Sequence, residues 1–220
     1  MKKLILLSLS IFCLISCRVE KPYDCGPVLK AKTIRSSFTP LVEILELGPG
    51  KVFADVGASS GAYDVMFSTL VSDVTFYIQD LDSTCLNQDQ LDKIFDYYSK
   101  QQGLDLRKRN EFKIVLGSYT ESKLPVNHFD VIYSNATYHA FSKPGAMISD
   151  IRRKLKDEGV LFIRDGFSEE GKPEICPDES CARPIPTETS FMQVMEENGF
   201  QLLQKWEDFQ GQPLFKFGKK

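Results

Sequence analysis

The chain has 220 residues, of which 42% are hydrophobic and 26% are charged, and its formal net charge is -3. This length and apolar content suffice for one domain with a sizeable core. Nucleic-acid binding usually requires a basic face, so the slightly acidic balance leads us to expect no nucleic-acid partner.

The N-terminus has the layout of a bacterial secretory signal. Two lysines follow Met1, an apolar run extends over residues 4–15, and Ser16 precedes Cys17. This run is shorter than the roughly 20 apolar residues that a transmembrane helix needs, and a short basic segment before an apolar one is typical of a signal peptide. The segment Leu14-Ile15-Ser16-Cys17 resembles the lipobox of bacterial lipoproteins.

The lipobox resemblance implies that Cys17 is lipidated, which would anchor the protein to a membrane of the bacterial cell envelope. We therefore expect a signal peptide over residues 1–16, a tether and N-terminal segment over residues 17–38, and a folded domain over residues 39–220. The alternatives are an uncleaved apolar N-terminal helix and a misassigned start, and the latter would leave the protein in the cytoplasm.

Four of the six cysteines lie outside the signal and permit three pairings in an oxidising compartment. Cys176 and Cys181 are close together in a Pro-containing loop, so a local disulfide is expected between them. The pairing of Cys25 and Cys85 stays open. A zinc site is disfavoured because neither a second Cys pair nor a nearby His completes four ligands.

Helical and extended patterns alternate from residue 39 onward. Thr39 is expected to cap a helix that has Pro40 in its first turn and ends at Gly48. Strands are predicted over residues 51–56, 74–79, 112–116, 129–134, 159–164, 200–206 and 213–217, and helices over residues 63–71, around 91–98, from 144 onward and over 187–199. The alternation predicts an α/β, Rossmann-like three-layer sandwich with a mainly parallel seven-stranded sheet. The short turn before the last strand predicts that one C-terminal strand is antiparallel.

Ligands of such sheets bind beyond the carboxyl ends of the strands. The loop after the first strand reads Asp55-Val56-Gly57-Ala58-Ser59-Ser60-Gly61. Gly57 permits a tight turn, and Gly61 permits close approach of the backbone to a ligand. Asp80 ends the second strand with Leu81 beside it. An acid about 20 residues beyond a glycine loop suits a ribose diol, because a carboxylate accepts both hydroxyl protons.

These segments resemble class I S-adenosylmethionine-dependent methyltransferases from roughly residue 39 to the C-terminus. Residues 47–61 resemble motif I, Asp80 has the position of the ribose acid, residues 117–119 resemble the adenine-side loop, and residues 129–135 and 155–163 resemble the segments of the fourth and fifth strands. Ser59 replaces the middle glycine of the loop, and Ser118 replaces a frequent Asp. The resemblance implies that S-adenosylmethionine binds at Asp55, Gly57, Ala58, Ser59, Gly61, Asp80, Leu81, Ser118, Tyr119 and Asn135.

A nicotinamide dinucleotide is the rival ligand. The spacing Gly57-x-Ser59-x-x-Ala62 matches its fingerprint poorly. Asp55 would also repel a pyrophosphate, whereas a carboxylate is compatible with a sulfonium and an ammonium group.

Candidates for catalysis follow the fourth strand. His139 could serve as a general base, with Tyr138 beside it, and the alternative for His139 is a structural residue at a helix edge. The long connection over residues 165–186 and the segment before Thr39 are expected to cover the methyl acceptor. The acceptor would be a small molecule or a protein side chain. A non-catalytic extracytoplasmic lipoprotein that binds another ligand or partner stays open, because S-adenosylmethionine is made in the cytoplasm.

Overall fold

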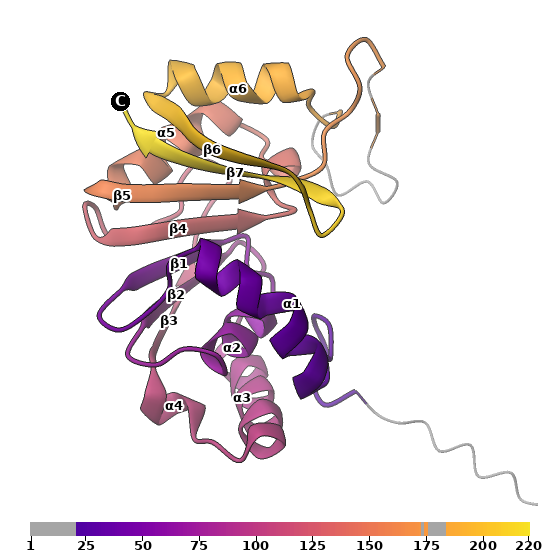
Figure 1. Cartoon of the computed structure of the whole chain (residues 1–220), viewed down its shortest axis with the longest axis vertical. Coiled ribbons are helices and arrows are strands. Elements are labelled where there is room, and N and C mark those ends of the chain that lie inside the picture. Colours follow the sequence, from indigo (N-terminus) through magenta and orange to yellow (C-terminus); the bar gives the residue numbers. More distant parts are fainter. Residues whose placement is uncertain (1–20, 173, 176–183) are drawn as a thin grey trace, which may run out of the picture.

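A computed structural model describes residues 21–172, 174–175 and 184–220. Its seven strands form one sheet: β1 (Val52–Val56), β2 (Thr75–Asp80), β3 (Glu111–Leu116), β4 (Phe129–Asn135), β5 (Leu155–Arg164), β6 (Phe200–Phe209) and β7 (Gln212–Lys219). Their order is β3-β2-β1-β4-β5-β7-β6. Because β7 pairs antiparallel with both β5 and β6, it is the one reversed strand. The predicted Rossmann-like architecture is confirmed (Figure 1).

Helices cover both faces of the sheet and produce two cores. One core contains buried residues of α1 (Ala31–Ile44), α2 (Ala62–Ser68), α3 (Gln88–Gln102) and α4 (Leu106–Arg109). The other contains residues of the 3-10 helix η1 (Tyr138–Ala140), α5 (Pro144–Lys154) and α6 (Glu188–Glu197). Successive strand residues point to opposite faces, so Phe53 of β1 enters the first core and Ala54 enters the second.

The predicted start of the first helix, at Thr39, is wrong. In the structure α1 begins at Ala31 after Lys30, and Pro40 lies inside it. Ile34, Phe38 and Leu41 of α1 are all buried and form one continuous apolar stripe. Burial of this stripe extends the helix N-terminally across the proline, whose local cost it outweighs.

Residues 21–30, here named the N-terminal strap, pack on the domain although the sequence predicted a tether there. Tyr23 is buried, and its hydroxyl lies 3.0 Å from that of Tyr98 on α3. The amide of Leu29 donates to the same Tyr98 oxygen at 3.0 Å. The tyrosine pair therefore joins the strap to α3.

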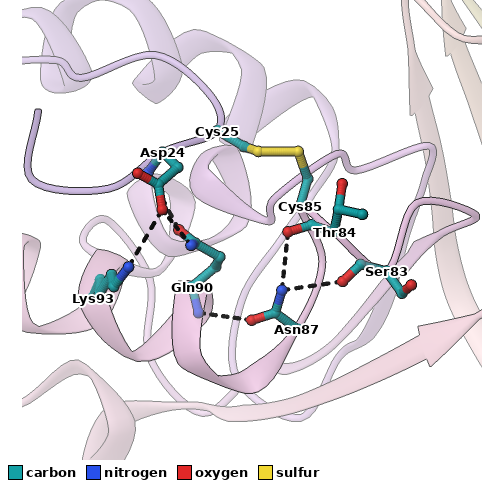
Figure 2. Close-up of polar contacts among 8 residues, drawn as sticks. All are labelled: Asp24, Cys25, Ser83, Thr84, Cys85, Asn87, Gln90 and Lys93. Carbon is teal, nitrogen blue, oxygen red and sulfur yellow. Dashed lines mark hydrogen bonds and ion pairs between the residues drawn. A yellow bond between two sulfur atoms is a disulfide. The ribbon is translucent and has the colours of Figure 1, made fainter.

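A disulfide between Cys25 and Cys85 joins the strap to the loop that follows β2 (Figure 2). This finding settles the pairing that the sequence left open. The expected Cys176–Cys181 pair and the lipidation site Cys17 lie outside the described residues. Across the described part of the chain, no helix is long and apolar enough to cross a membrane.

Candidate functional site

The loop after β1 folds against the end of β2. The amides of Gly57 and Ala58 both donate to the carbonyl of Gln79, at 2.9 and 3.0 Å. Gly57 has a φ of 84°, a left-handed conformation that favours glycine. Ser59 takes the position of the expected middle glycine and is also left-handed, with a φ of 53°. The substitution by serine therefore keeps a backbone turn that glycine would adopt more readily.

Asp80 is held directly against this loop. Its Oδ2 accepts from the amide of Ser59 at 2.6 Å, and its Oδ1 accepts from the amides of Leu81 and Asp82 at 2.7 and 3.0 Å. Hydrogen bonds to an ionised carboxylate are short and strong. Two acids at the ends of adjacent strands, Asp55 and Asp80, thus lie on the two sides of one glycine-containing turn.

Two pockets open at the carboxyl ends of the parallel strands. The first, about 280 Å³ in volume, is lined by residues that include Gly57, Asp80, Leu81, Tyr119 and His139. The second, about 300 Å³ in volume, is lined by residues of α1, β1, α2, β4, β5 and the β6–β7 turn, and Asp55 and Asn135 are among them. Six of the ten predicted cofactor residues are thus divided between two neighbouring pockets.

Thr137 packs on Gly57 and lines the first pocket. Its hydroxyl donates to the carbonyl of Asn135 at 2.9 Å. A Cβ atom placed on Gly57 would lie only 2.2 Å from Cγ2 of Thr137. Gly57 is therefore required by this contact as well as by its φ. Thr137 could not be predicted from the sequence, because this contact exists only once β1 and β4 are paired.

Four of the predicted cofactor residues lie outside both pockets. Gly61 is the N-cap of α2, and a Cβ atom there would lie 2.9 Å from Cγ2 of Ile78. Gly61 therefore permits the close approach of the start of α2 to β2, and its contact with a ligand stays a prediction. Ser118 donates to the carbonyl of Glu121 at 3.3 Å within a turn. Ala58, Ser59, Gly61 and Ser118 line neither pocket.

Tyr138, predicted as a catalytic candidate, also lines neither pocket. It is 1% exposed and packs on Phe191 of α6 in the second core, with ring centroids 4.7 Å apart. Because Tyr138 begins η1, its burial fixes the short helix that also carries His139. Tyr138 therefore contributes to the site by positioning His139.

His139 is held by an acid that the sequence analysis missed. Asp165 follows β5 directly and is 1% exposed. Its Oδ1 lies 2.7 Å from Nδ1 of His139, and its Oδ2 accepts from the backbone amide of His139 at 3.0 Å. An imidazole oriented by a buried carboxylate is the arrangement of many general bases. Its position after a parallel strand was the available signal for Asp165.

Of the two segments predicted to cover the methyl acceptor, only the one before Thr39 lines a pocket among the described residues. Leu29, Thr33 and Ser37, all before Thr39, line the second pocket. Of the connection over residues 165–186, no residue that the structure describes lines either pocket. The N-terminal segment thus forms a wall of the site, because the first turns of α1 lie beside the ends of β4 and β5.

The strand order, the reversed β7 and the acid-flanked turn after β1 define a class I methyltransferase-like Rossmann fold. A family model described as a methyltransferase domain matches residues 54–163, half of the chain. The chain therefore belongs to this methyltransferase-domain family. No curated protein matches it.

Solved structures show the same fold at low sequence identity. A SAM-dependent methyltransferase from Aquifex aeolicus has a TM-score of 0.59 and 18% identity, over 86% of this chain and 98% of that one. A TehB-like SAM-dependent methyltransferase from Corynebacterium glutamicum has a TM-score of 0.55 and 18% identity, over 89% and 90% of the two chains. The YcgJ protein from Bacillus subtilis has a TM-score of 0.55 and 18% identity, over 78% and 72%.

Proposed function

We propose that this protein is an S-adenosylmethionine-dependent methyltransferase that acts on a small molecule or on a protein side chain. The observation that carries the proposal is the position of Asp80, which lines the first pocket while its carboxylate is fixed to the loop after β1. A carboxylate at this place in a Rossmann-like sheet suits the two hydroxyls of a ribose. Gly57 and Leu81, in the same pocket, supply the surrounding backbone and apolar surface.

The second pocket fits the amino-acid end of the same ligand. Asp55 is 3% exposed and lines this pocket, and its Oδ1 has no hydrogen-bond partner among the described residues. A buried carboxylate without a partner suits a cationic group and disfavours a pyrophosphate. Asp55 therefore supports S-adenosylmethionine over a dinucleotide.

When bound, the cofactor supplies a methyl group on an activated sulfonium, so the contribution of the protein is mainly to position the reactants. His139 lines the first pocket and is oriented by Asp165. We assign His139 the removal of a proton from acceptors that must lose one on methylation. Tyr138 assists by anchoring η1 in the second core.

Calorimetry with S-adenosylhomocysteine, the demethylated product, tests the proposal on the purified full-length protein. The wild type is expected to bind, and Asp80→Ala is expected to bind about tenfold or more weakly, because it loses hydrogen bonds to a charged group. Asp82→Ala is the matched control, since Asp82 lies in the same loop, bonds Thr84 and lines neither pocket. An absence of heat from the wild type would exclude the cofactor, and equal affinities of wild type and Asp80→Ala would remove the ribose role.

We also propose that Cys17 is lipidated and that the domain lies in the cell envelope. The signal layout of residues 1–17 supports this. The Cys25–Cys85 disulfide supports it independently, because disulfides persist in oxidising compartments.

Radiolabelled fatty acid is expected to be incorporated by cells that express the wild type and to be lost in Cys17→Ala. Cys13→Ala is the matched control, because it removes the other cysteine of the signal and should keep the label. Equal labelling of wild type and Cys17→Ala would contradict the anchor.

The disulfide also favours a second candidate function. An oxidising compartment lies apart from the cytoplasmic supply of S-adenosylmethionine, so the fold could serve a lipoprotein that binds another ligand or partner without catalysis. The calorimetric experiment separates the two candidates, because only the first requires binding of the demethylated product.

A further inference from the structure

Two buried carboxyl groups adjoin the second pocket. Asp55 is the residue before the last of β1 and lines the pocket, whereas Asp64 lies in the first turn of α2 and is 0% exposed. Oδ1 of Asp55 and both carboxyl oxygens of Asp64 have no hydrogen-bond partner among the described residues. Buried polar groups are almost always paired, so this pair indicates a proton or a cation that the protein side chains do not supply.

The charged and titratable groups around Asp55 do not neutralise it. Asp80 approaches from β2, Tyr63 from α2 and Tyr133 from β4, and none of these is a cation. Arg164 of β5 lines the pocket, but its guanidinium donates to Oδ1 of Asn135 at 2.8 Å and to the carbonyls of Phe209 and Gln210 at 2.9 and 2.7 Å. From α1 the pocket is lined by Thr33 and Ser37, whose side chains carry no charge.

Aromatic rings complete the walls of this pocket. Tyr63, Phe67 and Tyr133 line it together with Phe38 of α1, and Phe38 contacts the rings of both Tyr63 and Phe67 edge-on, with centroids 5.5 and 5.1 Å apart. Aromatic faces attract organic cations. An acid among aromatic rings therefore favours an ammonium group over an anion.

The protonation of the empty pocket follows from the same burial. Burial and the charge of Asp80 raise the pKa of Asp55 to about 8. Burial, followed by the charge of Asp55, raises the pKa of Asp64 well above its usual range. At neutral pH the pair is therefore mainly protonated when no cation is present.

We propose that the second pocket binds the ammonium group of its ligand in exchange for a proton of the Asp55–Asp64 pair. The exchange balances, because the ammonium enters as a cation, one carboxyl group becomes a carboxylate, and the proton leaves to solvent. This inference rests on the proposed function, which supplies an ammonium-bearing ligand. Since Asp64 lines neither pocket, it acts through Asp55.

Calorimetry of S-adenosylhomocysteine binding at pH 7, in two buffers of different ionisation enthalpy, measures the exchange directly. We expect the wild type to release roughly 0.5 to 1 proton per ligand and its affinity to rise by up to about tenfold from pH 6 to pH 7. The Asp55→Asn/Asp64→Asn double variant keeps neutral side chains of the same shape. Asp157→Asn is the matched control, because the Asp157 side chain is 94% exposed and lines neither pocket.

The control is expected to release as many protons as the wild type. A folded double variant that no longer binds, or that binds without releasing a proton, supports the pair as the proton source. Wild-type binding without proton release overturns the inference and leaves the proposed function intact, whereas an absence of wild-type binding removes the proposed function itself. Proton release from the double variant equal to that of the wild type also overturns the inference.

Discussion

Removal of the Cys25–Cys85 disulfide is expected to lower the free energy of unfolding by about 4 kcal/mol and the melting temperature by roughly 10 °C. The two cysteines are 60 residues apart in the sequence, so the cross-link closes a long loop in the unfolded chain. In the chain-entropy account, the stabilisation grows with the length of that loop.

Apart from the buried contact of Tyr23 with Tyr98, the polar contacts of the strap that would remain are weak. Asp24 of the strap accepts from Gln90 and pairs with Lys93 at 3.3 Å, but both charged side chains are at least half exposed (Figure 2). Exposed ion pairs contribute little. The hydroxyl of Ser60, which donates to the carbonyl of Cys25 at 3.0 Å, adds one ordinary hydrogen bond. These contacts position the strap without replacing the covalent link.

Calorimetric unfolding of the wild type and of the Cys25→Ser/Cys85→Ser double variant measures this effect. A dithiol reductant should lower the melting temperature of the wild type toward that of the double variant and leave the double variant unchanged. Equal melting temperatures of the oxidised wild type and the double variant would show that the tyrosine contacts of the strap suffice. Cys85 lies in the loop that leaves Asp80, so ligand affinity is expected to fall along with stability.

The architecture was accessible from the sequence because its strands are short apolar runs separated by helical patterns. The reversed β7 followed from one short turn. The start of α1 was missed because Pro40 and Thr39 are strong local signals, whereas the stripe of Ile34, Phe38 and Leu41 has meaning only against the sheet. Local propensity is a weak prior wherever tertiary burial is large.

Part of the site could be predicted from the sequence, because the order of strands and loops already indicates which residues follow the parallel strands. Asp80 follows a strand and lies beside the glycine loop, as parallel topology requires. The Cys25–Cys85 pair joins segments far apart in the sequence, so proximity along the chain gave no reason to choose it. Asp64 reads in the sequence as an ordinary acid in the first turn of a helix. Its burial beside Asp55 depends on the packing of α2 against β1.

The ligand-free protein is expected to lose stability as the pH rises from about 5 to 9. In the unfolded chain, Asp55 and Asp64 release their protons near pH 4. In the folded chain, burial and the charge of Asp80 raise the pKa of Asp55 to about 8, and burial and the charge of Asp55 raise that of Asp64. The folded state therefore binds more protons between these values, and stability falls by up to about 1.4 kcal/mol per pH unit for each group.

Other carboxyl groups act in the opposite direction but at lower pH. Ion pairing and hydrogen bonding lower the pKa of Glu46, bonded by Lys216, and of Asp130, bonded by Lys156. Groups of this kind contribute stability that is fully present above about pH 5 and is lost as the pH falls. The two effects together place the stability maximum of the ligand-free protein near pH 5.

Urea unfolding at pH 5, 7, 8 and 9 tests the decline, with the Asp55→Asn/Asp64→Asn variant as the comparison. The double variant should have a nearly flat profile over this range and should exceed the wild type at pH 9 by several kcal/mol. A difference between wild type and double variant that stays constant with pH would show that both carboxyl groups are already ionised at pH 5. Since a bound ammonium would replace the missing proton, saturating S-adenosylhomocysteine should restore the stability of the wild type most strongly at pH 8 and leave the slope of the double variant unchanged.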